Sequence, residues 1–368
     1  MSPFDDRDAA RPGRSATAEA STASPATIAA ILPRKPFWGA RIVQVPLFRA
    51  LRERYPEARI LLFAAADGGE EFVRWRLGDE VRPNEGRAGL PGAVRRERPD
   101  VVLNLRRKST VSCVAAGVSG ARRIGFDEGP LARLLDERVR YDPQIYMASR
   151  FASLVDPGAR ARPDRTTIPL FRRWMEERIE REKKGRRATG LESAADALAG
   201  RVVLLPGAGR PEKRWPLARF VALGRALAND VGEKAVLVLG PRERGLLEEL
   251  SPDPGVEVRD QLEIGGLLRL FASALLVVGN DCGPSHLAQL AGRRFLGLYR
   301  AGYSTIEDWF LDKANSDLVA TQPGQGMDSI LVETVLSKAR VLLVRNEAAD
   351  AIVPFSREEW RRPRAESL

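Results

Sequence analysis

The chain has 368 residues, 44% of them hydrophobic and 29% charged, and carries a formal net charge of +10 at pH 7. This composition is typical of a soluble protein of about two domains, and apolar runs such as residues 274–278 are far too short to cross a bilayer, which takes about 20 residues. The basic charge favours acidic partners, but there is no zinc-finger spacing or RNP-like aromatic motif, so no specific nucleic-acid binding is predicted.

The amino-terminal segment, residues 1–26, is rich in Ala, Ser, Thr and Pro and has no continuous apolar core of the kind a signal peptide carries. We therefore expect a disordered leader. Cys113 and Cys282 are far apart and lack C-x-x-C spacing, which predicts neither a disulfide framework nor a zinc site. These features favour a cytoplasmic location.

The first predicted domain covers residues 27–171, where short apolar runs alternate with segments of helical period. We predict strands over 27–32, 58–64, 100–105 and 122–126, and helices over 46–55, 92–99 and 109–118. Such alternation is typical of βαβ units that build a parallel sheet with helices on both faces. A charged, mostly helical linker is predicted over 172–200, with a break at Gly190.

The same pattern restarts in a second predicted domain, residues 201–327. We predict strands over 201–206, 234–240, 255–258, 274–280 and 294–299, and helices over 216–230, 243–250, 264–272 and 284–292. In the last segment, 328–368, a helix over about 328–345 is expected to pack back across the joint and to precede a basic tail. The predicted fold class is α/β: two Rossmann-like, doubly wound domains that face a cleft at the carboxyl ends of their strands, where ligands bind.

The only histidine of the chain, His286, lies in the turn that follows the predicted strand 274–280. Pro284 stands where the first residue of a helix is expected, a position that proline favours, and Gly283 would let a ligand approach the backbone closely. The free amides and the dipole of a helix start favour anions. We predict that His286 lies beside a bound anion; the alternative is a histidine packed beside a capping Asp281.

A second turn, residues 204–216, follows the first strand of this domain. Ala208 and Gly209 are small enough for phosphate oxygens to reach backbone amides, and Lys213 supplies a positive charge. The spacing is not that of a Walker loop. A third turn, after the strand 234–240, offers Glu243 as an acceptor for ribose hydroxyls. The alternative for these turns is an ordinary loop with solvated charges.

Together the three turns resemble glycosyltransferase family 9, the lipopolysaccharide heptosyltransferases and their relatives. The resemblance lies in P-G-A-G followed by K-R-W-P, in an acidic residue after the next strand, and in D-C-G-P-S-H, in that order. Residues 45–60 and 98–126 are similar to two segments of the amino-terminal half of the family, so the resemblance covers about residues 27–340.

The resemblance implies a GT-B fold and an inverting transfer of a sugar, a heptose from ADP-heptose, to a lipopolysaccharide-core or other glycan acceptor. It implies no cofactor and no metal, a nucleotide-sugar and an anionic glycolipid or glycan as partners, and peripheral contact with the inner membrane through the basic surface. The donor-binding residues that it implies are Ala208, Gly209, Lys213, Glu243, Asp281, Cys282, Gly283 and His286.

The sequence departs from the family where the catalytic base is expected. Gly39 matches the family pattern, but Ala40 stands in place of the aspartate that usually removes the acceptor proton. Three explanations remain open: the loop is aligned differently, another carboxylate such as Asp127 or Asp67 serves as base, or the protein is a non-catalytic nucleotide-sugar-binding member of the fold. Other departures are Asn104 for an aspartate, Cys282 for Thr or Ser, and 299–305 in place of a G-P-T turn.

Overall fold

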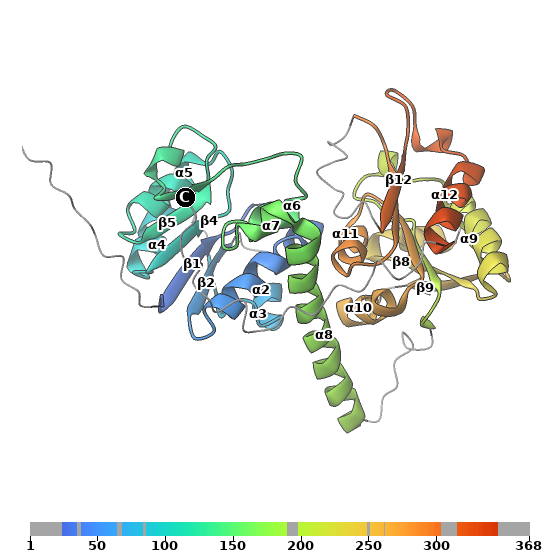
Figure 1. Ribbon diagram of the computed structural model, residues 1–368, viewed down its shortest axis with the longest axis horizontal. Helices are drawn as coiled ribbons and strands as arrows, with labels where there is room; N and C mark the ends of the chain where they lie inside the picture. The colour runs from blue at the N-terminus through green and yellow to red at the C-terminus, as the bar shows by residue number, and fades with distance from the viewer. Residues whose placement is uncertain are drawn as a thin grey trace, which may run out of the picture.

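Two α/β units lie side by side, with the long helix α8 (Pro163–Thr189) between them (Figure 1). The computed structural model describes residues 24–34, 38–64, 68–83, 86–189, 198–248, 251–260, 262–302 and 315–344. Within these residues, no helix combines the length and the apolar character needed to cross a membrane.

The first unit is built on a sheet of six parallel strands in the order β3-β2-β1-β4-β5-β6. Its strands are β1 (Thr27–Ile31), β2 (Arg59–Ala64), β3 (Glu80–Pro83), β4 (Val101–Asn104), β5 (Arg122–Phe126) and β6 (Glu137–Val139). The four strands predicted here are confirmed. The sequence did not predict β3 and β6 because both are short edge strands without a buried apolar run.

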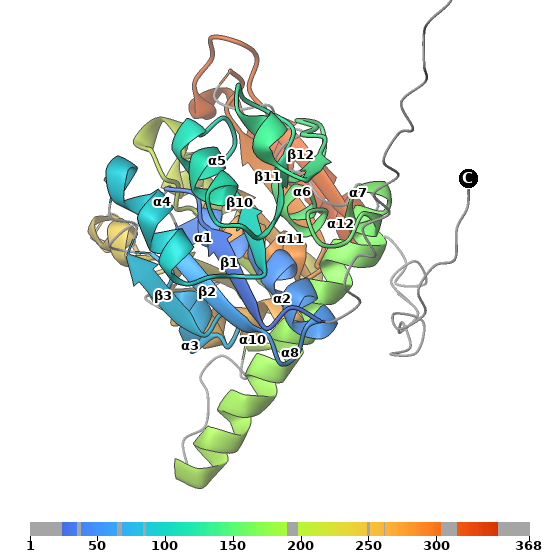
Figure 2. The ribbon, with the colours of Figure 1, turned by 90° about the vertical axis from the view of Figure 1, so that its left-hand side faces the viewer.

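Helices cover both faces of this sheet. They are α1 (Trp38–Ile42), α2 (Val45–Arg54), α3 (Glu70–Arg74), α4 (Gly86–Arg96), α5 (Thr110–Gly117), α6 (Met147–Ala152) and α7 (Gly158–Ala161), with a 3-10 turn η1 (Ala132–Leu134). Alternate residues of β1 serve the two faces: Ala29 and Ile31 pack under α4 and α5, whereas Ile28 and Ala30 face α2 and α8. Figure 2 looks onto the unit from the side of α4 and α5.

The second unit repeats this topology, with six parallel strands in the order β12-β11-β10-β7-β8-β9. The strands are β7 (Val202–Leu205), β8 (Ala235–Leu239), β9 (Val256–Asp260), β10 (Leu276–Asn280), β11 (Phe295–Tyr299) and β12 (Ser316–Ala320). The helices are α9 (Leu217–Val231), α10 (Ile264–Ser273), α11 (Gly283–Leu290) and α12 (Val332–Val344), with the 3-10 turns η3 (Pro211–Lys213), η4 (Pro241–Leu247) and η6 (Met327–Ser329). The helix predicted over 243–250 is thus a 3-10 turn that begins at Pro241.

Both sheets have the strand order of a doubly wound nucleotide-binding fold, and the predicted fold class is confirmed. In each sheet the order reverses beside the first strand, between β1 and β4 and between β7 and β10. In open parallel sheets the crevice at the carboxyl ends of these strands is where ligands bind. A ligand site is therefore expected at one or both of these two crevices.

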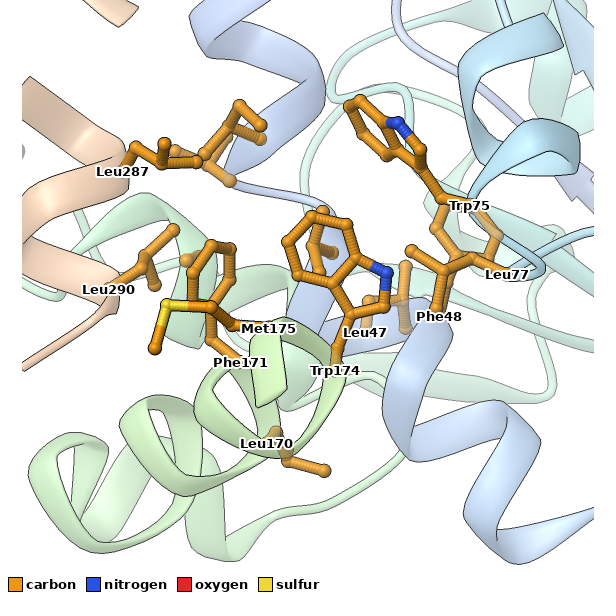
Figure 3. Packing of buried hydrophobic residues seen from close by; sticks show 14 of the residues in the cluster. Leu47, Phe48, Trp75, Leu77, Leu170, Phe171, Trp174, Met175, Leu287 and Leu290 are labelled. Atoms are coloured by element: carbon orange, nitrogen blue, oxygen red, sulfur yellow. The ribbon is translucent and has the colours of Figure 1, made fainter. Parts of the chain in front are cut away.

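The segment predicted as a charged linker contributes one buried helix face to the core. The predicted boundary between residues 171 and 172 falls within α8, and Phe171, Trp174 and Met175 on this helix are almost fully buried. Trp174 packs against Trp75 of the first unit, while Leu287 and Leu290 of α11 lie on the other side of α8 (Figure 3). Helix α8 therefore joins the two units through one continuous apolar cluster.

The last helix, α12, was expected to pack back across the joint, and the structure differs. Its buried residues Val335, Ala339 and Leu342 join the cluster of Trp215 and Phe220 under the second sheet. Helix α12 therefore completes the second unit, because its apolar stripe lies beside α9 on the same face of the sheet and covers β10, β11 and β12.

Candidate functional site

The predicted turns of the second unit meet at the carboxyl ends of β7, β8 and β10. The ammonium group of Lys213, at the end of η3, lies 2.7 Å from a carboxylate oxygen of Asp281, which follows β10. Both side chains are mostly buried, so their charges are incompletely screened by water. The structure thus brings together residues 68 positions apart, as the sequence predicted for the two turns.

A residue that the sequence analysis did not single out, Asn280, holds these turns in register. Its side chain is fully buried, donates to the carbonyl of Pro206 at 2.8 Å and accepts from the amide of Trp215 at 3.2 Å. A buried amide needs such partners to offset its lost hydration. An asparagine at the end of an otherwise apolar strand was the signal available in the sequence.

Glu243 lies in the third turn, beside the first two. One of its oxygens accepts from the amide of Gly240 at 3.1 Å, and the other lies 3.7 Å from the guanidinium of Arg214. A Cβ added to Gly207 would lie 2.9 Å from the carboxyl carbon of Glu243. A Cβ added to Gly240 would lie 2.7 Å from an oxygen of the same carboxylate, so Glu243 requires glycine at both positions, whereas a Cβ on Gly209 would meet nothing within 4 Å. Ala208 beside it is buried.

His286 is buried in the first turn of α11 and faces the other unit. Its Nδ1 atom is 2.9 Å from the hydroxyl of Tyr146, which precedes α6. Burial lowers the pKa of His286 to about 4, against the opposing effect of Asp281, so the ring is neutral at pH 7. Tyr146 is itself buried and its pKa is raised by desolvation. The pair is a neutral hydrogen bond between the two units, and no local sequence pattern predicts it.

The start of α11 is in close contact with α1. A Cβ added to Gly283 would lie 2.7 Å from Cε3 of Trp38, and one added to Gly39 would lie 3.2 Å from Cα of Gly283. Cys282 precedes the helix, and burial raises the pKa of its thiol to about 12, so the thiol stays protonated. The two units therefore touch through Gly39 and Gly283, at the turn for which the sequence predicts a bound anion.

The first unit holds a cavity of about 820 Å³ at the carboxyl ends of β1, β4 and β5. Its described lining includes Pro33, Arg34, Ala40, Leu105, Arg106, Arg107, Lys108, Ser109, Thr110, Val111, Phe126, Tyr141, Met147, Arg150 and Phe151. This is one of the two places where the strand order reverses. The sequence signal for this cavity is a run of three consecutive basic residues between a buried strand and the helix cap Ser109.

Of the two residues predicted as candidates for the catalytic base, Asp127 and Asp67, the structure describes only Asp127. Asp127 lies just after β5 and accepts from the amide of Tyr141 at 2.8 Å, so it stands next to a residue of the cavity wall. Asp67 lies outside the described residues. Asn104 caps the turn after β4, where its side-chain oxygen accepts from the amide of Arg106 at 3.1 Å.

Two doubly wound units that face each other, with charged strand-to-helix turns at the joint, define the GT-B class of fold. ADP-heptose lipopolysaccharide heptosyltransferase II of E. coli has the same fold with a TM-score of 0.57 and 21% identity, over 88% of this chain and 100% of that one. The E. coli heptosyltransferase WaaC with ADP matches with a TM-score of 0.62 and 17% identity, over 86% and 99%.

The fold is shared more widely. The UDP-GlcNAc 2-epimerase of Methanocaldococcus jannaschii matches with a TM-score of 0.57 and 13% identity, over 87% of this chain and 93% of that one. No curated protein matches in sequence. At these identities the likenesses establish the fold alone.

The family model for glycosyltransferase family 9 (heptosyltransferase) matches residues 87–308, which is more than half of the chain. The chain belongs to this family and is a glycosyltransferase. The matched range includes the turns of Lys213, Glu243 and Asp281 and ends before the last strand of the second sheet.

Proposed function

We propose that the protein transfers a heptose from ADP-heptose to a lipopolysaccharide-core or other glycan acceptor, with inversion and without a metal. The observation that supports this most is the buried Lys213–Asp281 pair beside the start of α11. Neighbours of the same fold include a heptosyltransferase with ADP and the same enzyme with ADP-2-deoxy-2-fluoro heptose.

In this proposal the donor occupies the joint between the units. Its diphosphate lies at Lys213 and the first amides of α11, which stabilise the negative charge that develops on the leaving nucleotide. Glu243 lies near the ribose, and Ala208, Gly209, Cys282 and Gly283 form the walls. His286, neutral and held by Tyr146, is a hydrogen-bonding group here and not a positive charge.

The acceptor approaches from the first unit. Its hydroxyl oxygen forms a bond to the anomeric carbon while the bond from that carbon to the diphosphate breaks on the opposite side, and a base removes the hydroxyl proton. Asp127 and Asp67 remain the candidates for this base. A non-catalytic nucleotide-sugar-binding protein is the second proposal, and Ala40, which lines the cavity, is the observation that favours it.

A titration of ADP into the protein, followed by calorimetry, tests the donor site. Lys213→Met should weaken ADP binding by about tenfold or more, the effect of one charge-assisted contact to phosphate. The matched control is Lys338→Met, because Lys338 also forms a lysine–aspartate pair, with Asp317 at 2.9 Å, on the far side of the second unit. Equal ADP affinities for the two variants would contradict the proposal.

Contact with the inner membrane is proposed from the net charge of +10 alone. Sedimentation with vesicles of anionic lipid should show binding that falls as the salt concentration rises. Binding that is unchanged in high salt would contradict an electrostatic contact.

A further inference from the structure

The hydrogen bond between Tyr146 and His286 joins the two units in a place that water does not reach. The hydroxyl of Tyr146 lies 2.9 Å from Nδ1 of His286, and the two residues are 2% and 5% exposed. A neutral imidazole carries one proton, on Nδ1 or on Nε2, and its other nitrogen is an acceptor. The partner of Nδ1 therefore decides which nitrogen keeps the proton.

The surroundings of His286 keep the ring neutral. Burial lowers its pKa to about 4 and the ammonium group of Lys213 acts in the same direction, whereas the carboxylate of Asp281 opposes both. At pH 7 the ring therefore has one donor nitrogen and one acceptor nitrogen. Burial also raises the pKa of Tyr146, so the phenol keeps its proton.

The direction of the bond follows from the partners that Tyr146 has. Among the residues that the structure describes, the hydroxyl of Tyr146 bonds to His286 alone. If Nδ1 carried the imidazole proton, the hydroxyl would accept it, and its own proton would be buried without an acceptor. That arrangement costs free energy, because nothing replaces the lost hydration of the O–H group. The phenol therefore donates to Nδ1, and the imidazole proton is on Nε2.

The Nε2 edge of the ring faces the contact between the units. Cδ2, the ring carbon bonded to Nε2, lies 3.3 Å from the position of a Cβ built on Gly39. The same position is 3.7 Å from the amide nitrogen of Gly283, the first residue of α11. The edge that carries the N–H group and the first amide of α11 thus flank one point, at the turn where the donor diphosphate is proposed to bind.

This arrangement defines what the imidazole can do chemically. With Nδ1 accepting from Tyr146 and a proton on Nε2, the ring offers no basic nitrogen to an acceptor hydroxyl. His286 is then not the base that replaces the carboxylate missing at Ala40. A buried N–H group is instead suited to an anionic oxygen, because hydrogen bonds to charged acceptors are the stronger ones.

We propose that Tyr146 is a positioning residue of the donor site: its hydroxyl donates to Nδ1 of His286 and so holds a proton on Nε2, which donates to a diphosphate oxygen of the nucleotide-sugar. The first unit thereby contributes to donor binding without touching the donor. The inference rests on the proposed function for the identity of the ligand as a nucleotide-sugar.

Nitrogen-15 NMR of the ligand-free wild type tests the direction of the hydrogen bond. His286 is the only histidine of the chain, so untagged protein labelled with nitrogen-15 histidine shows the two ring nitrogens of this residue alone. At pH 7 we expect the resonance of an unprotonated nitrogen for Nδ1 and that of a protonated nitrogen for Nε2. A proton on Nδ1 would overturn the inference, and this measurement needs no variant to fold.

Removal of the hydroxyl tests whether Tyr146 sets the position of the proton. Tyr146→Phe keeps the ring but takes away the donor to Nδ1, so the resonances should shift as the proton becomes shared between the two nitrogens. The matched control is Tyr299→Phe, because Tyr299 is a buried tyrosine whose hydroxyl is bonded to Gln289. The control should keep the wild-type spectrum. If Tyr146→Phe keeps it too, the inference is wrong.

Calorimetric titration of ADP tests the link to the donor site. Tyr146→Phe should bind ADP about threefold to tenfold more weakly than the wild type and Tyr299→Phe, the effect of one hydrogen bond. Equal affinities of Tyr146→Phe and the wild type would refute the role of Tyr146 and leave the donor site in place. A wild type that does not bind ADP would refute the donor site itself, while the NMR spectra still decide whether Tyr146 holds the proton on Nε2.

Discussion

His286 shows how much burial changes the role of a single side chain. The histidine is neutral because burial lowers its pKa to about 4 from the ordinary 6.5. The folded protein therefore binds the proton more weakly than the unfolded chain does. The stability that this side chain contributes is complete above pH 6.5 and is lost as the pH falls toward 4.

The pH dependence of unfolding checks this assignment. The free energy of unfolding should fall between pH 6.5 and pH 4 by about 3 kcal/mol more in the wild type than in His286→Gln, since 2.5 units of pKa correspond to that amount. Denaturant titrations of both proteins across this range give the difference, in which the contribution of the carboxylates cancels. A parallel pH dependence in the two proteins would show that His286 titrates normally.

Truncation of His286 would not test donor binding alone, because it would also destabilise the fold. Removing the imidazole leaves the hydroxyl of Tyr146 buried without its partner, which costs about 1–3 kcal/mol. The sequence suggested a histidine that faces a ligand, so it gave no reason to expect this loss. The partner at 2.9 Å comes from 140 residues away, a distance along the chain that no local pattern encodes.

Among the elements, the contact of α1 with α11 depends on a glycine at each helix. Gly39→Val should lower the free energy of unfolding by about 1–3 kcal/mol, because the added methyl groups must enter a space where even a Cβ lies 3.2 Å from the backbone of Gly283 and 3.3 Å from the ring of His286. Gly185→Val in α8 is the control, since a Cβ there meets nothing within 4 Å.

Thermal or denaturant unfolding of the two variants gives the comparison. We expect the control to be neutral or slightly stabilising, because valine is a better helix former than glycine. If Gly39→Val unfolds like the control, the two helices are not in contact in solution.

The elements that the sequence predicted well are those with a buried apolar run. The central strands of both sheets, such as those predicted over 274–280 and 201–206, contain a continuous apolar run and were placed to within two residues. The short edge strands β3 and β6 carry charged residues and give no such signal. The charge density of 172–200 suggested a linker, yet one face of α8 is buried between the two units. Which face of a charged helix is buried depends on the surfaces it packs against, and these are not encoded in its own sequence.

The candidate site was predictable to the same degree. The turns proposed to bind the donor have recognisable spacing, and the structure brings Lys213 and Asp281 of two of them into contact. The cavity of the first unit is built from side chains of the turn between β4 and α5, of α6 and of the loop of Tyr141, which come together only in the folded chain. Spacing along the sequence does not carry that information.

On the scale of the whole molecule, the two units share one apolar core. The cluster runs from Phe48 of α2 through Trp174 of α8 to Leu287 of α11 and Phe271 of α10. An interface of this kind resembles a domain interior more than a contact between independent domains. We therefore expect both units to unfold in a single cooperative transition.

Calorimetry tests the shared core, with equal calorimetric and van't Hoff enthalpies as the expected result. Far-ultraviolet and near-ultraviolet circular dichroism should then give the same midpoint. Two resolved transitions would show that α8 does not couple the units.

We propose that the joint between the units is a sugar-transfer site. The most direct test is the release of ADP from ADP-heptose by the purified protein, with and without a heptose-deficient lipopolysaccharide core. We predict release that depends on the acceptor and falls in Lys213→Met. Binding of ADP-heptose without release, with or without the acceptor, would contradict transfer of this sugar to this acceptor and favour the non-catalytic binding protein.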